Sequence, residues 1–272
     1  MNNNKIYVVT HKPYILSEKL EKKNYELITV GNKVKTNKGV LDASGDNIAS
    51  KNPNFCELTA VYWIWKNINS KIKGFCHYRR YFTHSTWKYN EDKIISMNEI
   101  ERILSSNPNT IILPERKYYK MSAEELYLQC GYKKDLATTR QVIKEKYPEY
   151  LHEFDKMLNS NTGYITNMMI APANIFNSYC NWLFDILFEV EKRTDISNYT
   201  AAEARIYGYI SERLVDLWVT HNKLKVVEFQ SINPETDHGI KYIMYRLSVK
   251  LGLYKSLKTM LFDLHSKKRV IK

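Results

Sequence analysis

The residues with the clearest chemical potential are His77, Arg79 and Arg80, in the stretch GFCHYRRYF of residues 74–82. Two adjacent guanidiniums beside an imidazole suit an anion, because an Arg fork binds phosphate oxygens in a bidentate way and keeps its charge. The stretch is expected to end a buried strand, and open α/β sheets bind ligands at the carboxyl ends of strands. It therefore predicts a phosphate site. The alternative is that one Arg pairs with an acid and the other is solvated.

Glu212 is the first candidate for a general base. It stands among apolar residues of the predicted helix 200–219, where partial burial raises the pKa of a carboxyl group. The alternative is an ordinary surface face in which Glu212 lies beside Arg213 or Asp216. Asp46, in a turn-rich loop, is the second candidate for the same role.

Other polar residues follow predicted strands. Thr10 and His11 end the first one, where they either contact a nucleotide or form a turn before a helix. Asn47 offers an amide to ribose or sugar hydroxyls, although a plain Asx turn is the better explanation. Asn167 interrupts the apolar run of residues 164–170, and a buried Asn needs partners, which are either a ligand or the backbone.

The elements that must position these groups alternate between strands and helices, which predicts an α/β fold with a central, mostly parallel sheet. Apolar residues at helical spacing predict a helix over residues 57–68, with Asn52 and Asn54 as caps and Pro53 in a first helical turn. Other strands are predicted at residues 5–10, 25–30, 75–82, 110–113, 164–170 and 223–229. Other helices are predicted at residues 97–104, 135–146, 149–158, 174–192 and 200–219, and at Ser122, where Glu125 completes a capping box.

Composition places the chain among soluble globular proteins. It has 272 residues, 44% of them hydrophobic and 26% charged, enough for one large domain with a sizeable core. The net charge of +12 implies an acidic partner, which is a nucleic acid, a phosphorylated ligand or an anionic membrane. The four cysteines have no paired spacing and are expected to be buried free thiols. The chain begins without a signal-peptide core, and the uncharged run 157–184 is too rich in Asn to span a membrane, which predicts a cytoplasmic protein.

Residues 240–272 are expected to form a basic amphipathic helical tail behind a domain of residues 1–239. Such a helix is typical of a membrane-surface anchor, and each basic residue near an anionic leaflet contributes roughly 1 kcal/mol. The alternative is a helix packed on the domain with solvated lysines. The basic residues are Lys241, Arg246, Lys250, Lys255, Lys258, Lys267, Lys268, Arg269 and Lys272.

Five motifs, in order, resemble one bacterial family that covers about residues 5–218. These are the capsular, exopolysaccharide and O-antigen glycosyltransferases long described only as a domain of unknown function, with galactofuranosyltransferases among them. The resemblance implies a GT-A-like fold, UDP-galactofuranose as donor, a lipid-linked glycan as acceptor, inversion at the anomeric carbon, and a place on the inner face of the cell membrane. The motifs are VVTHKPY, LDASGDNIASKNPNFCELTAVYWIWKN, GFCHYRRYF, TNMMIAPANIFNSYCNWLF and ARIYGYISERLVDLW.

The resemblance also assigns roles. GT-A enzymes carry an Asp-x-Asp motif for a divalent metal where this chain has HYRR, so Arg79, Arg80 and His77 are expected to replace the metal at the UDP diphosphate, with Mg²⁺ or Mn²⁺ not excluded. Asn52 and Glu57 are expected to contact nucleotide or sugar, and Asn167 and Arg205 donor or acceptor. Thr10, His11 and Asn47 complete the nucleotide-sugar set.

Other readings of the sequence remain open. UDP-galactopyranose or UDP-glucose would serve as donor in the same pathway. A basic nucleic-acid-binding module is the rival from another class, although much of the positive charge lies in the tail and no zinc-finger or RNA-recognition signature occurs.

Overall fold

The computed structural model describes residues 4–31, 38–85, 88–164, 166–233 and 244. Its main sheet has eight strands in the order β3-β2-β1-β4-β9-β6-β10-β5. All are parallel to one another except β9 and β5. The predicted α/β fold with a mostly parallel sheet is therefore confirmed. The strands are β1 Lys5–Thr10, β2 Tyr25–Thr29, β3 Val40–Leu41, β4 Ile72–His77, β5 Tyr81–Thr83, β6 Thr110–Pro114, β9 Met169–Pro172 and β10 Lys225–Ile232.

One half of the sheet curls strongly. β9, β6 and β10 lie between β4 and β5 in the sheet, yet only Tyr78, Arg79 and Arg80 separate these two strands in the chain. β5 follows from β4 through a tight turn and then pairs with β10 at the far end of the sheet. The strands from β4 to β5 must therefore wrap round until the two ends of this half meet.

Strand β1 shows how the sequence builds a core on each face of the sheet. Successive side chains of a strand point to opposite faces. Ile6 and Val8 accordingly lie in one hydrophobic cluster, and Tyr7 and Val9 in the other. A strand buried on both faces must be apolar throughout, which explains the continuous run that predicted it.

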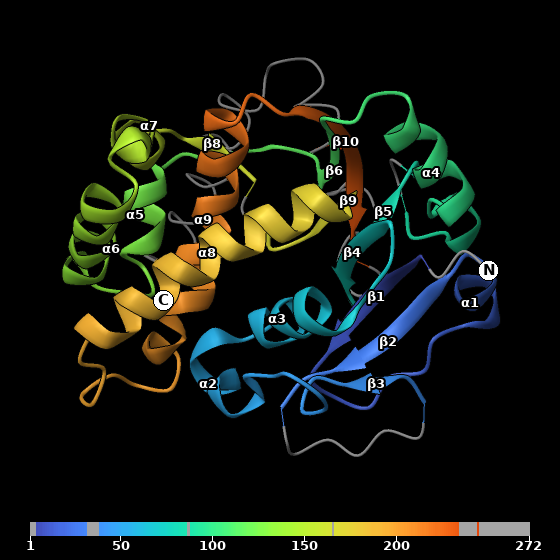
Figure 1. Ribbon diagram of the computed structural model, residues 1–272, viewed down its shortest axis with the longest axis horizontal. Coiled ribbons are helices and arrows are strands. Elements are labelled where there is room, and N and C mark those ends of the chain that lie inside the picture. The colour runs from blue at the N-terminus through green and yellow to red at the C-terminus, as the bar shows by residue number, and fades with distance from the viewer. Residues whose placement is uncertain (1–3, 32–37, 86–87, 165, 234–243, 245–272) are drawn as a thin grey trace, which may run out of the picture.

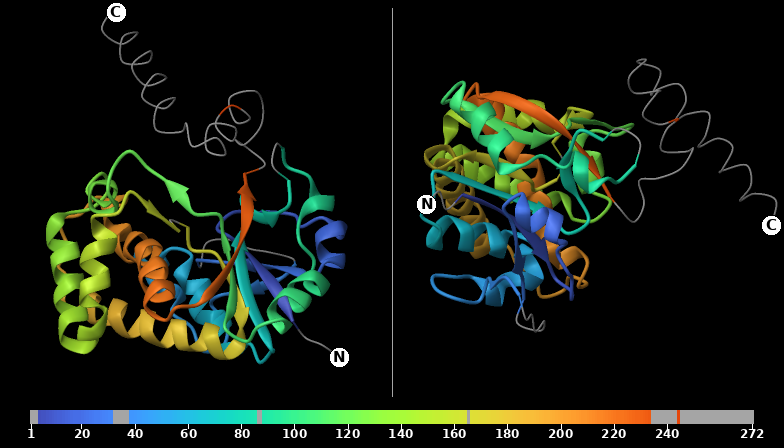
Figure 2. Two further views of the ribbon diagram at one scale, coloured as in Figure 1. Left: turned by 90° about the horizontal axis from the view of Figure 1, so that it is seen from above. Right: turned by 90° about the vertical axis from the view of Figure 1, so that its right-hand side faces the viewer.

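Helices cover both faces of the sheet (Figure 1). α1 (Glu18–Lys22) and α4 (Met97–Ser105) contribute to the smaller cluster, whereas α3 (Leu58–Asn67), α8 (Ala173–Arg193) and α9 (Ile206–His221) contribute to the larger. α5 (Ala123–Tyr127), α6 (Lys133–Lys146) and α7 (Leu151–Leu158) gather at one end of the molecule, away from α1 and α4 (Figure 2). A small two-stranded sheet, β7 (Lys117–Tyr118) and β8 (Thr162–Gly163), leads into this helical end.

The predicted helix of residues 57–68 is confirmed as α3, but its predicted caps are wrong. A separate helical turn, α2 (Asn52–Phe55) with Pro53 in its first turn, precedes α3, and no side chain caps α3. Cys56 breaks the two apart with φ 53° and ψ −130°, in a region that residues other than Gly rarely adopt. Asn52 donates instead to the Cys56 carbonyl oxygen at 2.8 Å, and Asn54 to the Ala204 carbonyl oxygen at 2.9 Å.

Most other elements match the prediction, including β1, α4, α8 and the capping box of Ser122 and Glu125. Several predictions were wrong in their bounds, among them those for β4, β9 and α9. β4 begins at Ile72 rather than at residue 75, the predicted strand 164–170 is a strand only from Met169, and α9 begins at Ile206 after a 3-10 turn. In the part of the chain that the structure describes, no helix is long and apolar enough to cross a bilayer. The predicted tail, residues 240–272, lies outside the described residues apart from Met244.

Asp135 ties the helical end to the loop that precedes α9. Its carboxylate is fully buried and accepts from the hydroxyls of Tyr127 at 2.9 Å and Tyr199 at 2.6 Å, and from the Tyr132 amide at 3.0 Å. We expect Asp135→Asn to lower the free energy of unfolding by about 2–3 kcal/mol, because an amide nitrogen would face a buried donor. Tyr199→Phe, which removes one bond only, should cost about 1 kcal/mol. Urea denaturation measures both, and equal values for the two variants would contradict this account.

Candidate active site

A cavity of about 620 Å³ opens at the carboxyl ends of the parallel strands, at the end of β1 and β4 and beside the first turns of α2. This size is in the range of cofactor and small-molecule sites. The cavity gathers eight of the predicted site residues from segments far apart in the sequence. Its lining consists of Val9, His11, Val30, Asn52, Pro53, Cys56, Glu57, His77, Tyr78, Arg79, Arg80, Arg205, Glu212 and Asn233.

The two adjacent arginines are held at the cavity by the turn that joins β4 to β5. His77 and Arg80 exchange backbone hydrogen bonds of 3.2 and 2.8 Å across this turn, and the buried Tyr78 donates its amide to the Val9 carbonyl oxygen at 3.1 Å. Arg79 and Arg80 are both exposed. Arg80 forms no ion pair with any described acid. The alternative in which an acid of the protein neutralises one of the two arginines therefore does not apply to Arg80. Its charge is therefore available to a ligand.

Arg205, directly before α9, adds a third guanidinium to the cavity lining. Its Nε donates to the Cys56 sulfur at 3.1 Å, and its guanidinium carbon lies 5.4 Å from the ring centre of Tyr209. Burial raises the pKa of Cys56 to about 11, so the sulfur is a neutral thiol at physiological pH and does not neutralise the charge of Arg205. The positive field also reaches His11, whose pKa is lowered by burial and then by Arg79, Lys12 and Arg205.

Glu212 and Glu57 line the same cavity as the three arginines. Burial, and then the negative charge of Glu57, raises the pKa of Glu212 to about 8, against the opposing effects of Arg213, Arg80 and Arg205. The carboxyl group is therefore mostly protonated at pH 7 and is a strong base once ionised.

The residues next to Glu212 on α9 have partners elsewhere. Arg213 donates to the carbonyl oxygens of Ala123 at 3.2 Å and Tyr209 at 2.6 Å. Asp216 forms a bidentate ion pair with Arg116, at 2.6 and 3.0 Å. The surface alternative, in which Glu212 lies in a solvated face with Arg213 or Asp216, is therefore not what the structure has.

Asn167 lies directly beneath the cavity rather than in its wall. Only 4% of it is exposed, and its side-chain nitrogen donates to Glu57 Oε1 at 2.6 Å and to Ser211 Oγ at 2.8 Å. The backbone carbonyl oxygen of Asn167 lies 2.8 Å from Nε2 of His77. The partners that a buried Asn side chain requires are therefore protein groups, and one of them, Glu57, lines the cavity.

Besides Asn167, three predicted residues lie outside the cavity lining. The Thr10 hydroxyl forms a local turn, donating to the Lys12 carbonyl oxygen at 2.8 Å. Asn47 makes the plain Asx turn, since its side-chain oxygen accepts from the Ala49 amide at 3.2 Å. Asp46 is exposed and accepts from the Tyr62 hydroxyl at 3.1 Å, on the outer side of α3.

Sequence reasoning missed six of the lining residues, which are Val9, Val30, Pro53, Cys56, Tyr78 and Asn233. All four cysteines are free, as predicted, but Cys56 and Cys130 are only partly buried. A thiol in an apolar context gives no sequence signal for a pocket, and the positive φ of Cys56 appears only in three dimensions. Among the described residues, no three His, Cys, Asp or Glu side chains gather in a way that would hold a metal ion.

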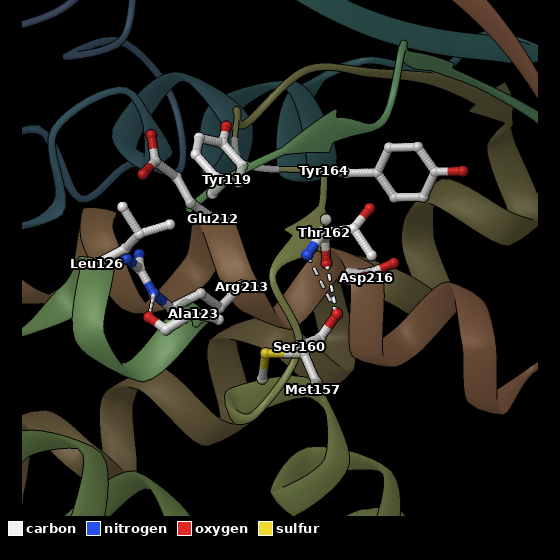
Figure 3. A pocket seen from close by; sticks show the side chains of 11 residues that line it. Tyr119, Ala123, Leu126, Met157, Ser160, Thr162, Tyr164, Glu212, Arg213 and Asp216 are labelled. Atoms are coloured by element: carbon white, nitrogen blue, oxygen red, sulfur yellow. Dashed lines mark hydrogen bonds between the residues drawn. The ribbon is translucent and has the colours of Figure 1, made fainter. Parts of the chain in front are cut away.

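Glu212 also lines a second, small pocket on the side of the helical end (Figure 3). Tyr119 lies beside Glu212 there, and the Arg213 side chain turns away from Glu212 toward α5. The pocket is bounded by α5, β8 and α9, and its exposed lining is mostly apolar. Glu212 thus lines both the large charged cavity and a small, mostly apolar pocket.

The comparisons with known proteins agree with this fold. The chain is similar to a solved structure titled "WbbM bifunctional glycosyltransferase apo structure", with 30% identity and a TM-score of 0.72 over 84% of this chain and 45% of that one. It thus spans less than half the length of the WbbM chain. No curated protein matches the sequence. The model of the family described as "Domain of unknown function (DUF4422)" matches residues 5–223. The chain therefore belongs to the DUF4422 family.

Proposed function

We propose that this protein is a glycosyltransferase of bacterial surface-polysaccharide synthesis that transfers a hexose from a UDP-sugar to a glycan acceptor. The observation that carries the proposal is the single cavity in which three arginines face two glutamates at the carboxyl ends of the strands. The similarity to WbbM, which its title calls a bifunctional glycosyltransferase, supports the reaction class. The donor that the family resemblance favours is UDP-galactofuranose, with UDP-galactopyranose and UDP-glucose as alternatives.

In this proposal the arginines bind the diphosphate. Arg79 and Arg80 approach from the turn after β4 and Arg205 from the start of α9, so two sides of the anion meet a guanidinium. As the bond to the sugar breaks, negative charge grows on the leaving UDP, and fixed cations stabilise it more in the transition state than in the ground state. The proposed reaction therefore runs without a divalent metal.

Glu212 is the proposed general base. An acceptor hydroxyl oxygen forms a bond to the anomeric carbon, its proton passes to the Glu212 carboxylate, and the bond from that carbon to the UDP oxygen breaks. The product is a glycoside, with UDP and one proton released. Inversion follows from the family resemblance. We propose that the acceptor approaches from the side of the small pocket beside Tyr119, because aromatic faces suit sugar rings.

UDP release tests the proposal directly. Purified protein would be incubated with each of the three UDP-hexoses and a panel of octyl glycosides as lipid-like acceptors, in EDTA or in Mn²⁺. We expect turnover of UDP-galactofuranose in EDTA. Turnover of a pyranose donor that requires Mn²⁺ would retain the transferase but overturn the donor and the metal-free chemistry. No acceptor-dependent release with any donor would overturn the function.

We further propose that the basic tail holds the enzyme at the inner membrane surface, close to a lipid-linked acceptor. Deleting residues 254–272 should abolish co-sedimentation with liposomes that contain anionic lipid and leave turnover of the octyl glycoside unchanged, because the deletion removes six basic residues, Lys255, Lys258, Lys267, Lys268, Arg269 and Lys272, and one acid. Liposomes of neutral lipid are the control. Unchanged binding of the truncated chain to anionic liposomes would contradict the anchor.

A further inference from the structure

Asn167 holds two hydrogen-bond acceptors at the cavity, His77 through its backbone carbonyl and Glu57 through its side chain. It joins the end of β4, the start of α3 and the middle of α9, through His77, Glu57 and Ser211. Its side-chain nitrogen is identified by its partners, since the Glu57 carboxylate only accepts. Asn167 is buried and touches no ligand space itself, whereas His77 and Glu57 both line the cavity.

The His77 ring is held in one tautomer. The Asn167 carbonyl oxygen, 2.8 Å away, can only accept, so Nε2 carries the hydrogen. Burial is the largest effect on the His77 pKa and lowers it, and Arg80 and Arg79 lower it further, whereas Glu57 and the bond to Asn167 raise it. The net direction favours the neutral ring. In that ring Nδ1 has a lone pair, and no described residue donates to it.

Glu57 offers a second acceptor of the same kind. Asn167 occupies Oε1, which leaves Oε2 without a hydrogen bond from any described residue. A diphosphate carries only acceptor oxygens and negative charge at neutral pH, so a carboxylate and an imidazole lone pair repel it. A sugar hydroxyl donates a hydrogen, and it matches both groups.

We propose that His77 and Glu57 form a subsite for the hydroxyl groups of the donor sugar, with Asn167 as its positioning residue. This subsite rests on the proposed function and divides the cavity in two. The arginines bind the diphosphate, and His77 and Glu57 accept hydrogen bonds from the sugar hydroxyls. The subsite also replaces the earlier expectation that His77 helps the arginines to stabilise UDP. A site built to accept from hydroxyls discriminates strongly against a ligand that lacks them, because its buried acceptors then remain unpaired.

The test compares the affinity for UDP with the affinity for the UDP-hexose that binds best, by calorimetry without acceptor. His77→Ala should weaken the UDP-hexose at least about tenfold and leave UDP within about twofold. Asn167→Ala should show a smaller selective loss, because it releases Glu57 but keeps the backbone carbonyl that holds His77. His84→Ala is the matched control, since His84 pairs with Glu99 outside the cavity lining and should change neither affinity.

Glu57→Gln keeps the fold testable if the other variants lose stability. The Gln side-chain oxygen satisfies Asn167, and its amide nitrogen then faces the cavity, so an acceptor becomes a donor of the same shape. The ratio of the two affinities should fall. An unchanged ratio in both His77→Ala and Glu57→Gln would overturn the subsite.

Deoxyfluoro donors locate the hydroxyl. For at least one UDP-hexose in which fluorine replaces a single hydroxyl, the affinity for the native protein should be as low as the affinity of the parent UDP-hexose for His77→Ala. The same analogue should bind His77→Ala no more weakly than it binds the native protein. Additive losses for every analogue would contradict direct contact. If the native protein binds UDP but no UDP-hexose, the proposed function itself has failed, which is a different result from an unchanged ratio.

Discussion

Replacing Arg79 and Arg80 together by alanine is expected to lower kcat/KM for transfer by about 10²–10⁴-fold. Each charge-assisted hydrogen bond to phosphate contributes about 1.5–3 kcal/mol, and the contribution grows as charge develops on the leaving UDP. UDP affinity should fall at least about tenfold. Initial rates of UDP release and calorimetry with UDP measure the two effects.

Matched variants separate this effect from general loss of charge. Arg140→Ala removes an Arg that pairs with Asp155 between α6 and α7, outside the cavity lining, and should leave both constants unchanged. Arg80→Lys keeps the charge but loses the planar fork, so it should recover only part of the rate. Normal UDP affinity in the double alanine variant would refute the phosphate role.

Glu212→Gln is expected to lower kcat by about 10²–10⁴-fold, which is the usual contribution of a general base. UDP affinity should not fall, because the substitution removes a carboxyl group that faces the arginines. The native rate should also depend on pH with a defined sign. Glu212 is raised to a pKa of about 8, so the active, ionised form is scarce at pH 7 and kcat/KM should rise tenfold per pH unit up to about pH 8, then level off. A flat profile between pH 6 and 9 would exclude Glu212 as the base.

The same carboxyl group makes stability depend on pH in the opposite direction from most acids. In the unfolded chain Glu212 ionises near its ordinary pKa of 4.5, whereas the folded protein retains the proton up to about pH 8. The folded state therefore binds more protons in this window, and stability falls as pH rises through it. Glu212→Gln cannot ionise, so it should melt at a higher temperature than the native protein at pH 8 and at a similar one at pH 4. This readout does not depend on any substrate.

The sequence predicted well those elements whose cause is local. The continuous apolar run of β1, the periodic apolar face of α8 and the reciprocal cap of Ser122 and Glu125 are each decided by neighbours in the chain. The break at Cys56 could not be predicted, because it is imposed by packing. An added Cβ at Gly208 would meet the Cys56 sulfur at 3.2 Å, so α9 packs closely against the break between α2 and α3.

The candidate site was predicted where residues stand at the ends of parallel strands. His11 and His77 line the same cavity because β1 and β4 are neighbouring parallel strands whose carboxyl ends lie together. Asn167 precedes β9, a strand that runs the other way, so it reaches the same region from beneath the cavity and serves other side chains. Asp46 and Asn47 stayed in local turns, because short polar side chains in a loop satisfy their own backbone first.

The curled half of the sheet determines when this site can form during synthesis. The turn that carries Arg79 and Arg80 leads into β5, and β5 is paired to β10 through residues more than 140 positions later in the chain, such as Thr83 with Gln230. A nascent chain that has passed the arginines still lacks the strand that holds their turn, and β10 itself pairs with β6. The turn that carries Arg79 and Arg80 is therefore fixed late in synthesis, after β10, near the end of the described domain, has been made.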